Sequence, residues 1–247
     1  MPEKLRADLV STDPEMTIVP LADGFRIGTT DTGEEIHHAA YTAALAASQS
    51  VYETAGKLAE ADEAIRSLGK QPDAATGARL RKNARAAMDR AQKTYADTLA
   101  KLAEHSDSLS AEAEGLIGTE TARLDINSNA RGAEVRSLLR TMPKHDREAL
   151  IESAIADGDQ EVVAGVLAAS PLLSGIDRKR HAMLREQARV RFAPEQDRLI
   201  KGIDRLANAM RTANGALEKR FGSITGAGDS RQARAERSLA ALEGGVS

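Results

Sequence analysis

The 247-residue sequence has no cysteine and no tryptophan, and it contains only three Phe and three Tyr. The lack of cysteine excludes disulfides, thiolate metal ligands and a cysteine nucleophile. Because aromatic side chains supply much of the buried area of large cores, this chain must build its core from Leu, Ile, Val and Ala, which suits slender helical hairpins. Its strongly apolar run Val162–Ala169 is far shorter than the roughly 18 residues that a membrane span needs, so we expect no membrane partner.

Motifs for catalysis and for metal binding are also missing. The sequence has no GxSxG, no phosphate-binding GxxxxGK[ST] and no HExxH, and none of its five His residues is spaced as His-x3-His. Asp157 and Asp159 form a carboxylate pair, but they flank Gly158 between two apolar helical segments, so helix capping accounts for them. We therefore expect no catalytic, cofactor-binding or metal-binding residue, and we predict that the protein is not an enzyme.

Residues 1–117, nearly half of the chain, are predicted to form a small β arm followed by a long helical hairpin. Asp23-Gly24 lies between two short apolar runs and predicts a β-hairpin turn within an extended arm over residues 1–32. Thr32 and Glu35 have the spacing of a capping box, which predicts that the next helix starts near residue 33. Heptad spacing, as in coiled coils, then extends through two long helices that fold back antiparallel between residues 33 and 117.

The remainder predicts a helical bundle over residues 118–221 and a flexible tail over residues 222–247. Gly158 and Gly175 are helix stops, and Ser170-Pro171 is a helix start. These signals divide residues 143–176 into a hub of short helices that joins the long hairpin to the C-terminal helices, and this hub contains the most apolar stretch of the chain, Ile155–Ile176. A break is expected at Ala193-Pro194, and another near Asn127-Ser128-Asn129. The predicted fold class is all-α.

A further heptad seam follows the proline break. Its members alternate by four and three, as apolar positions do along one helix face, and we name five of them as a candidate interface: Leu199, Ile203, Leu206, Met210 and Leu217. Two interpretations remain open. The seam can be buried within the chain as part of an antiparallel bundle, or it can be left for self-association or for a partner protein.

Charge is unevenly distributed along the chain. Residues 1–176 carry a formal net charge of −9 and residues 177–247 carry +6. On a helix, Arg178, Arg185 and Arg189 fall on one stripe, which could neutralise several phosphates. The alternatives are a solvated helix face, a face that docks against the acidic N-terminal two-thirds of the same chain, and a contact with an acidic partner protein. The near absence of aromatic stacking groups disfavours nucleic acid as the partner.

Residues 143–191 contain a charged helix, Gly-Asp, VVAGVL, ASPLLSG and then a basic helix. In this order they resemble segments of uncharacterised helical proteins encoded among the virion-assembly genes of tailed phages and prophages. The resemblance implies a structural protein of the decoration, scaffold or connector type, present in many copies or as a homo-oligomer. It also implies contacts with a capsid or portal-type protein, and synthesis in the cytoplasm before incorporation into the virion. The alternatives are a nucleic-acid-associated protein that uses the basic helix 178–191, and a cytoplasmic helical adaptor.

Overall fold

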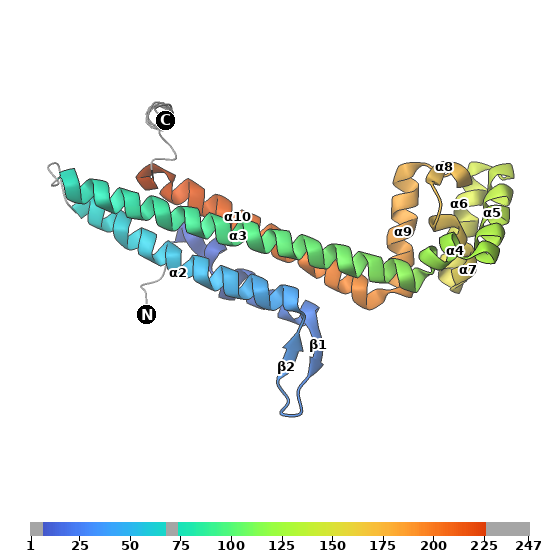
Figure 1. Ribbon diagram of the computed structural model, residues 1–247, viewed down its shortest axis with the longest axis horizontal. Coiled ribbons are helices and arrows are strands. Elements are labelled where there is room, and N and C mark those ends of the chain that lie inside the picture. The colour runs from blue at the N-terminus through green and yellow to red at the C-terminus, as the bar shows by residue number, and fades with distance from the viewer. Residues whose placement is uncertain (1–6, 68–73, 226–247) are drawn as a thin grey trace, which may run out of the picture. The chain divides into compact units, whose positions relative to one another are not determined.

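The computed structural model describes residues 7–67 and 74–225 (Figure 1). Its fold is all-α with one small antiparallel β hairpin near the N-terminus, as the sequence predicted. Contacts divide the chain into two compact units, which we call the bundle unit (residues 1–103 and 202–247) and the short-helix unit (residues 104–201). This division falls between residues 103 and 104, whereas the sequence suggested a boundary between 117 and 118. The long helices α3 (Ala74–Ile117) and α10 (Pro194–Thr225) each contribute residues to both units. The predicted tail, residues 222–247, begins inside α10, and residues 226–247 lie outside the described part of the chain.

The bundle unit begins with the short helices η1 (Ala7–Thr12), α1 (Pro14–Thr17) and η2 (Val19–Phe25). Strands β1 (Arg26–Thr29) and β2 (Glu35–His37) follow and form the hairpin. Asp23-Gly24 lies inside η2, so the turn predicted there is wrong. Thr30 instead closes the turn, because its N–H donates to the carbonyl of Glu34 (2.8 Å) and its carbonyl accepts from Gly33, whose φ is 85°.

The capping box predicted at Thr32 is also wrong, because Thr32 belongs to the hairpin turn. Its hydroxyl lies 2.8 Å from that of Thr30. Helix α2 begins later than expected and spans Ala39–Ser67. The hydroxyls of Thr30 and Thr32 form hydrogen bonds within the turn, and Gly33 adopts the positive φ that the turn needs. These local interactions favour the turn over an earlier helix start.

Helices α2, α3 and α10 lie alongside one another in the bundle unit (Figure 1). The ring of Phe25 stacks on Tyr41 near the start of α2 and lies against Gly202 of α10. Further along, Arg220 of α10 contacts Asp62 near the end of α2 at 3.1 Å. Helix α10 therefore runs parallel to α2, and α3 returns antiparallel to both. Large apolar side chains from all three helices are buried between them: Val51, Leu58, Tyr95, Leu102, Leu206 and Leu217.

The short-helix unit contains the last turns of α3 and the start of α10, with six helices between them. These are α4 (Thr119–Leu124), α5 (Ile126–Thr141), α6 (Lys144–Asp157), α7 (Gln160–Leu167), α8 (Pro171–Ser174) and α9 (Arg178–Phe192). Glycine ends α6 and α8 as predicted, since Gly158 and Gly175 have φ angles of 78° and 68°. The break before α5 lies at Asp125, which caps α5 by accepting from the N–H of Ser128 (2.7 Å).

The core of the short-helix unit is a single cluster built from α5, α6, α7 and α9. Its fully buried large residues are Ile117, Leu139, Ile151, Val163, Val166, Leu167 and Leu184. The apolar region 143–176 thus packs mainly on α5 and α9, whereas α3 contributes only its last helical residue, Ile117. Helices α5 and α7 approach closely where Gly132 faces Gly165.

Candidate functional site

The structure buries the predicted interface seam inside the folded chain. Leu199, Ile203, Leu206, Met210 and Leu217 are each at most 6% exposed. Of the two interpretations, burial within the chain is correct, and the seam is not available to a partner. The apolar side chains of the seam instead pack in the core of the folded chain and hold α10 in place.

The structure does not leave the predicted basic stripe of α9 free for phosphate. The Nε of Arg185 lies 3.1 Å from Glu114 Oε1, and its Nη2 donates to the carbonyl of Leu167. The Nε of Arg189 lies 3.5 Å from the buried carboxylate of Asp197. Only Arg178 of the three is exposed. Two of the three arginines therefore balance acidic groups of the same unit.

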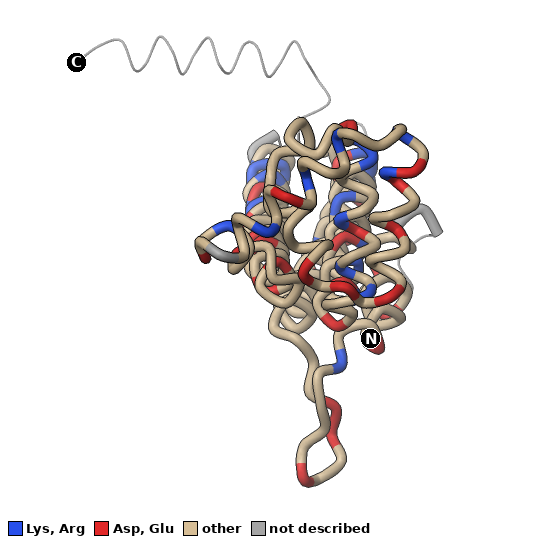
Figure 2. The backbone as a smooth tube through the Cα atoms, turned by 90° about the vertical axis from the view of Figure 1, so that its right-hand side faces the viewer, with Lys and Arg blue, Asp and Glu red and all other residues tan. Residues whose placement is uncertain are grey.

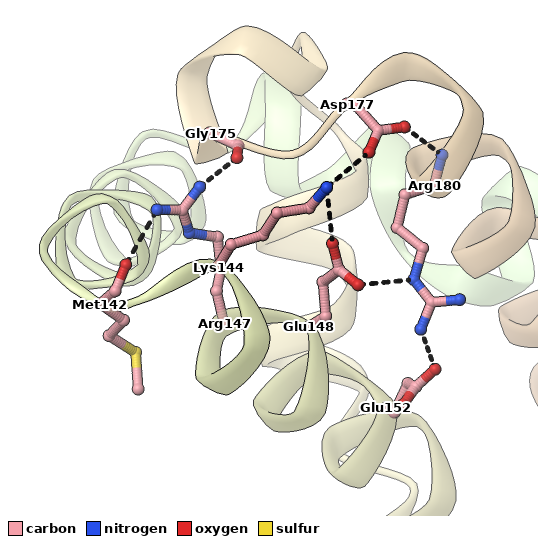
Figure 3. A network of polar contacts seen from close by, with 8 residues as sticks. All are labelled: Met142, Lys144, Arg147, Glu148, Glu152, Gly175, Asp177 and Arg180. Carbon is pink, nitrogen blue, oxygen red and sulfur yellow. Dashed lines mark hydrogen bonds and ion pairs between the residues drawn. The ribbon is translucent and has the colours of Figure 1, made fainter.

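Arg180, another basic residue of α9, belongs to a polar network that joins α6 to the start of α9 (Figure 3). Its guanidinium contacts Glu148 (3.4 Å) and Glu152 on successive turns of α6. Lys144 lies between Glu148 (3.9 Å) and Asp177 (3.5 Å), and Asp177 caps α9 by accepting from the N–H of Arg180. Hydrogen bonding to that N–H is the main cause that lowers the pKa of Asp177.

Arg147 fixes the ends of two helices in the same region (Figure 3). Its Nε donates to the carbonyl of Leu139 (2.8 Å), its Nη2 to that of Met142 (2.9 Å) and its Nη1 to that of Gly175. The last carbonyls of a helix have no partner within the helix, and they favour a cation. The polar contacts drawn in Figure 3 thus have a structural role, because every charged group in them is matched by a group of the same fold.

The corner between α4 and α5 presents apolar side chains to solvent. Leu124 is 73% exposed and Ile126 is 84% exposed. A groove of about 420 Å³ lies beside this corner, lined by residues of α3, α4, α5 and α7: Gly115, Gly118, Thr121, Ala122, Ser128, Arg131, Gln160, Glu161 and Ala164. Arg131 and Glu161 form an ion pair of 2.7 Å on it. We call Leu124, Ile126 and this groove the α4–α5 corner.

Of the described surfaces, the α4–α5 corner is the candidate functional site. Exposed apolar side chains beside a groove mark sites of protein association more often than isolated surface leucines do. The sequence signal for this corner is the pair of large apolar residues, Leu124 and Ile126, on either side of the capping Asp125. Heptad spacing does not reveal this pair, because neither residue belongs to a seam. The corner can bind an apolar surface with a polar rim.

Buried titratable groups occur elsewhere in the two units. Burial lowers the pKa of His181, and the positive charge of Arg185 lowers it further, while Glu114 opposes both. Burial raises the pKa of Tyr95 to about 12. Within residues 7–67 and 74–225, no three His, Asp or Glu side chains gather as a metal site would require. No helix in those same ranges combines the length and apolarity of a membrane span.

Comparisons of the chain with protein-family models, with curated protein sequences and with solved structures find no match.

Proposed function

We propose that this chain is a non-enzymatic structural or assembly protein of a tailed-phage particle, and that it acts through protein–protein contacts. The observation that carries the proposal is the α4–α5 corner, where two large apolar side chains are mostly solvent-exposed. The particle context rests on the resemblance of residues 143–191 to virion-assembly proteins. Mass spectrometry of particles released from the source strain tests that context, and we expect the chain to be present in many copies.

A second copy of the same chain is the partner that fits the corner. A two-fold contact places the same patch on both sides, so the patch must complement itself. Leu124 and Ile126 meet this condition because they are apolar. The rim also meets this condition. Arg131 and Glu161 carry opposite charges 2.7 Å apart, so in a two-fold contact Arg131 of one copy can face Glu161 of the other.

The solution mass tests self-association. Covering the exposed parts of Leu124 and Ile126 contributes about 2 kcal/mol each. Replacing both by Gln therefore removes about 4 kcal/mol per copy, or about 8 kcal/mol per dimer, and raises the dimer Kd by roughly 10⁵-fold to 10⁶-fold. Light scattering over a concentration series should show a discrete oligomer for the native chain and a monomer for Leu124→Gln/Ile126→Gln. The control Val10→Gln/Met16→Gln removes two exposed apolar residues of the bundle unit and should leave the mass unchanged. A native chain that is monomeric throughout contradicts self-association.

A further inference from the structure

The first five turns of α3 carry a concentrated positive charge. Residues 76–93 contain six basic side chains and one acidic one, Asp89, for a formal net charge of +5: Arg79, Arg81, Lys82, Arg85, Arg90 and Lys93. All six are exposed. At 3.6 residues per turn they fall within about half of the helix circumference, and they extend over about 20 Å of helix. We call this set the α3 basic face.

Most of the α3 basic face is not matched by acidic groups of the fold. Five of the six side chains make no ion pair and no hydrogen bond with another described residue: Arg79, Arg81, Lys82, Arg90 and Lys93. In contrast, Arg180, Arg185 and Arg189 of α9 all contact carboxylates of their own unit. Figure 2 shows Lys and Arg interspersed with Asp and Glu along the backbone. The first turns of α3 carry five exposed cations whose side chains contact no described carboxylate, although the whole chain has a net charge of −3.

The residues between these charges indicate the kind of partner. Ala78, Asn83 and Ala86 are exposed and small, so the helix backbone can approach a charged surface closely. The larger Met88 and Tyr95 are buried toward the bundle, so this face offers neither apolar anchors for a protein partner nor aromatic rings on which bases could stack. Charge without apolar or stacking groups suits the phosphate backbone of a duplex.

We propose that the α3 basic face binds the phosphate backbone of double-stranded nucleic acid without sequence preference. Four of its six cations are arginines, whose guanidinium can bond phosphate oxygens in a bidentate manner. An exposed helix face about 20 Å long follows roughly six base pairs at 3.4 Å each. This site is separate from helix 178–191, which the sequence indicated, and from the α4–α5 corner.

Fluorescence anisotropy of the full chain with a labelled duplex, titrated at several salt concentrations, tests the proposal. With about five phosphate contacts, log Kd should change with log salt with a slope of about 4 to 5. Arg81→Glu/Lys82→Glu should raise Kd at least about tenfold and lower the slope by about 2 or more. The matched control is Arg178→Glu/Lys179→Glu, which reverses an adjacent, exposed Arg-Lys pair on α9 and should leave Kd within about twofold.

Three results would overturn the proposal. The first is no binding of the duplex by the native chain at low salt. The second is an equal loss in both double variants, which would show that only total charge matters. The third is selective binding of polyglutamate in place of the duplex, lost in Arg81→Glu/Lys82→Glu, which would assign the face to an acidic protein. Circular dichroism of each variant should match that of the native chain, since all four substituted residues are exposed.

Discussion

Gly165→Ala tests the closest helix contact in the short-helix unit. A Cβ at this position would lie 2.9 Å from the Cα of Gly132, and a Cβ at Gly132 would lie 3.0 Å from the Cα of Gly165. Both obstacles are backbone atoms, which cannot rotate away. The crossing also allows the guanidinium of Arg136, itself buried, to donate to the carbonyl of Gly165. Alanine therefore forces α5 and α7 apart by roughly half an ångström or more, which weakens the contacts of the buried core around them.

The expected magnitude follows from two opposing contributions. Overpacking of this kind costs about 1 to 3 kcal/mol. Alanine offsets about 1 kcal/mol of that cost, because it favours the helical state over glycine. The net loss should be about 0 to 2 kcal/mol, which lowers Tm by up to about 8 °C for a chain of this size.

Thermal unfolding followed by circular dichroism measures this loss against a matched control. Gly56→Ala makes the same change inside α2, where a Cβ meets nothing within 4 Å. It should raise the free energy of unfolding by about 0.5 to 1 kcal/mol. If Gly165→Ala stabilises the chain as Gly56→Ala does, the two helices do not cross at these glycines and the packing described for this unit is wrong.

Three further predictions concern buried polar and apolar groups. Leu206→Asp places a charge at a fully buried seam position and should cost several kcal/mol, about 3 or more, in urea unfolding; an unchanged midpoint would show that the seam is not buried. Asp62→Ala removes a buried carboxylate that contacts Arg66 (2.8 Å) and Arg220 (3.1 Å), and should cost about 2 kcal/mol, whereas Glu60→Ala, at an exposed position of the same helix, should change the midpoint little. Because the pKa of His181 is lowered in the folded state, the unfolded chain binds more protons below about pH 6.5, so stability should fall as the pH falls from 7 to 5.5. His181→Gln should show a smaller fall, and an equal fall would contradict this reasoning.

Helix stops and starts were readable from the sequence wherever a single residue type decides them. Gly158 and Gly175 adopt positive φ, and Asp159 and Asp177 accept hydrogen bonds from helix N–H groups, all as local chemistry dictates. The Asp23-Gly24 turn and the Thr32 cap were predicted wrongly, because each signal also fits the structure that forms there. Asp23-Gly24 lies within η2, and Thr32 lies in the hairpin turn. The choice between the predicted and the observed structures depends on the packing of Phe25 against Tyr41 and Gly202, and Gly202 is far away in the sequence.

Charge counts along the sequence do not identify the carboxylate that each cation meets, although docking of the basic helix against acidic residues of the same chain was one of the interpretations left open. Arg185 pairs with Glu114, 71 positions earlier, and no count over a sequence window can anticipate that contact. The α3 basic face was missed because its positive charge was averaged out over a long segment. Its net charge of +5 was summed with the acidic residues of a 176-residue segment, although helical spacing alone places the six side chains on one face.

Disulfide trapping of the α4–α5 corner tests the proposed self-association most directly. The chain has no cysteine, so Ile126→Cys introduces a single thiol at the most exposed large apolar position of the corner. If two copies meet at this corner across a two-fold axis, mild oxidation should convert most of the variant into a covalent dimer that reductant reverses. Met16→Cys, equally isolated on an exposed site of the bundle unit, should remain monomeric. Equal, slow dimer formation by both variants would mean that the thiols meet only by random collision, and it would contradict the assembly contact proposed for this corner.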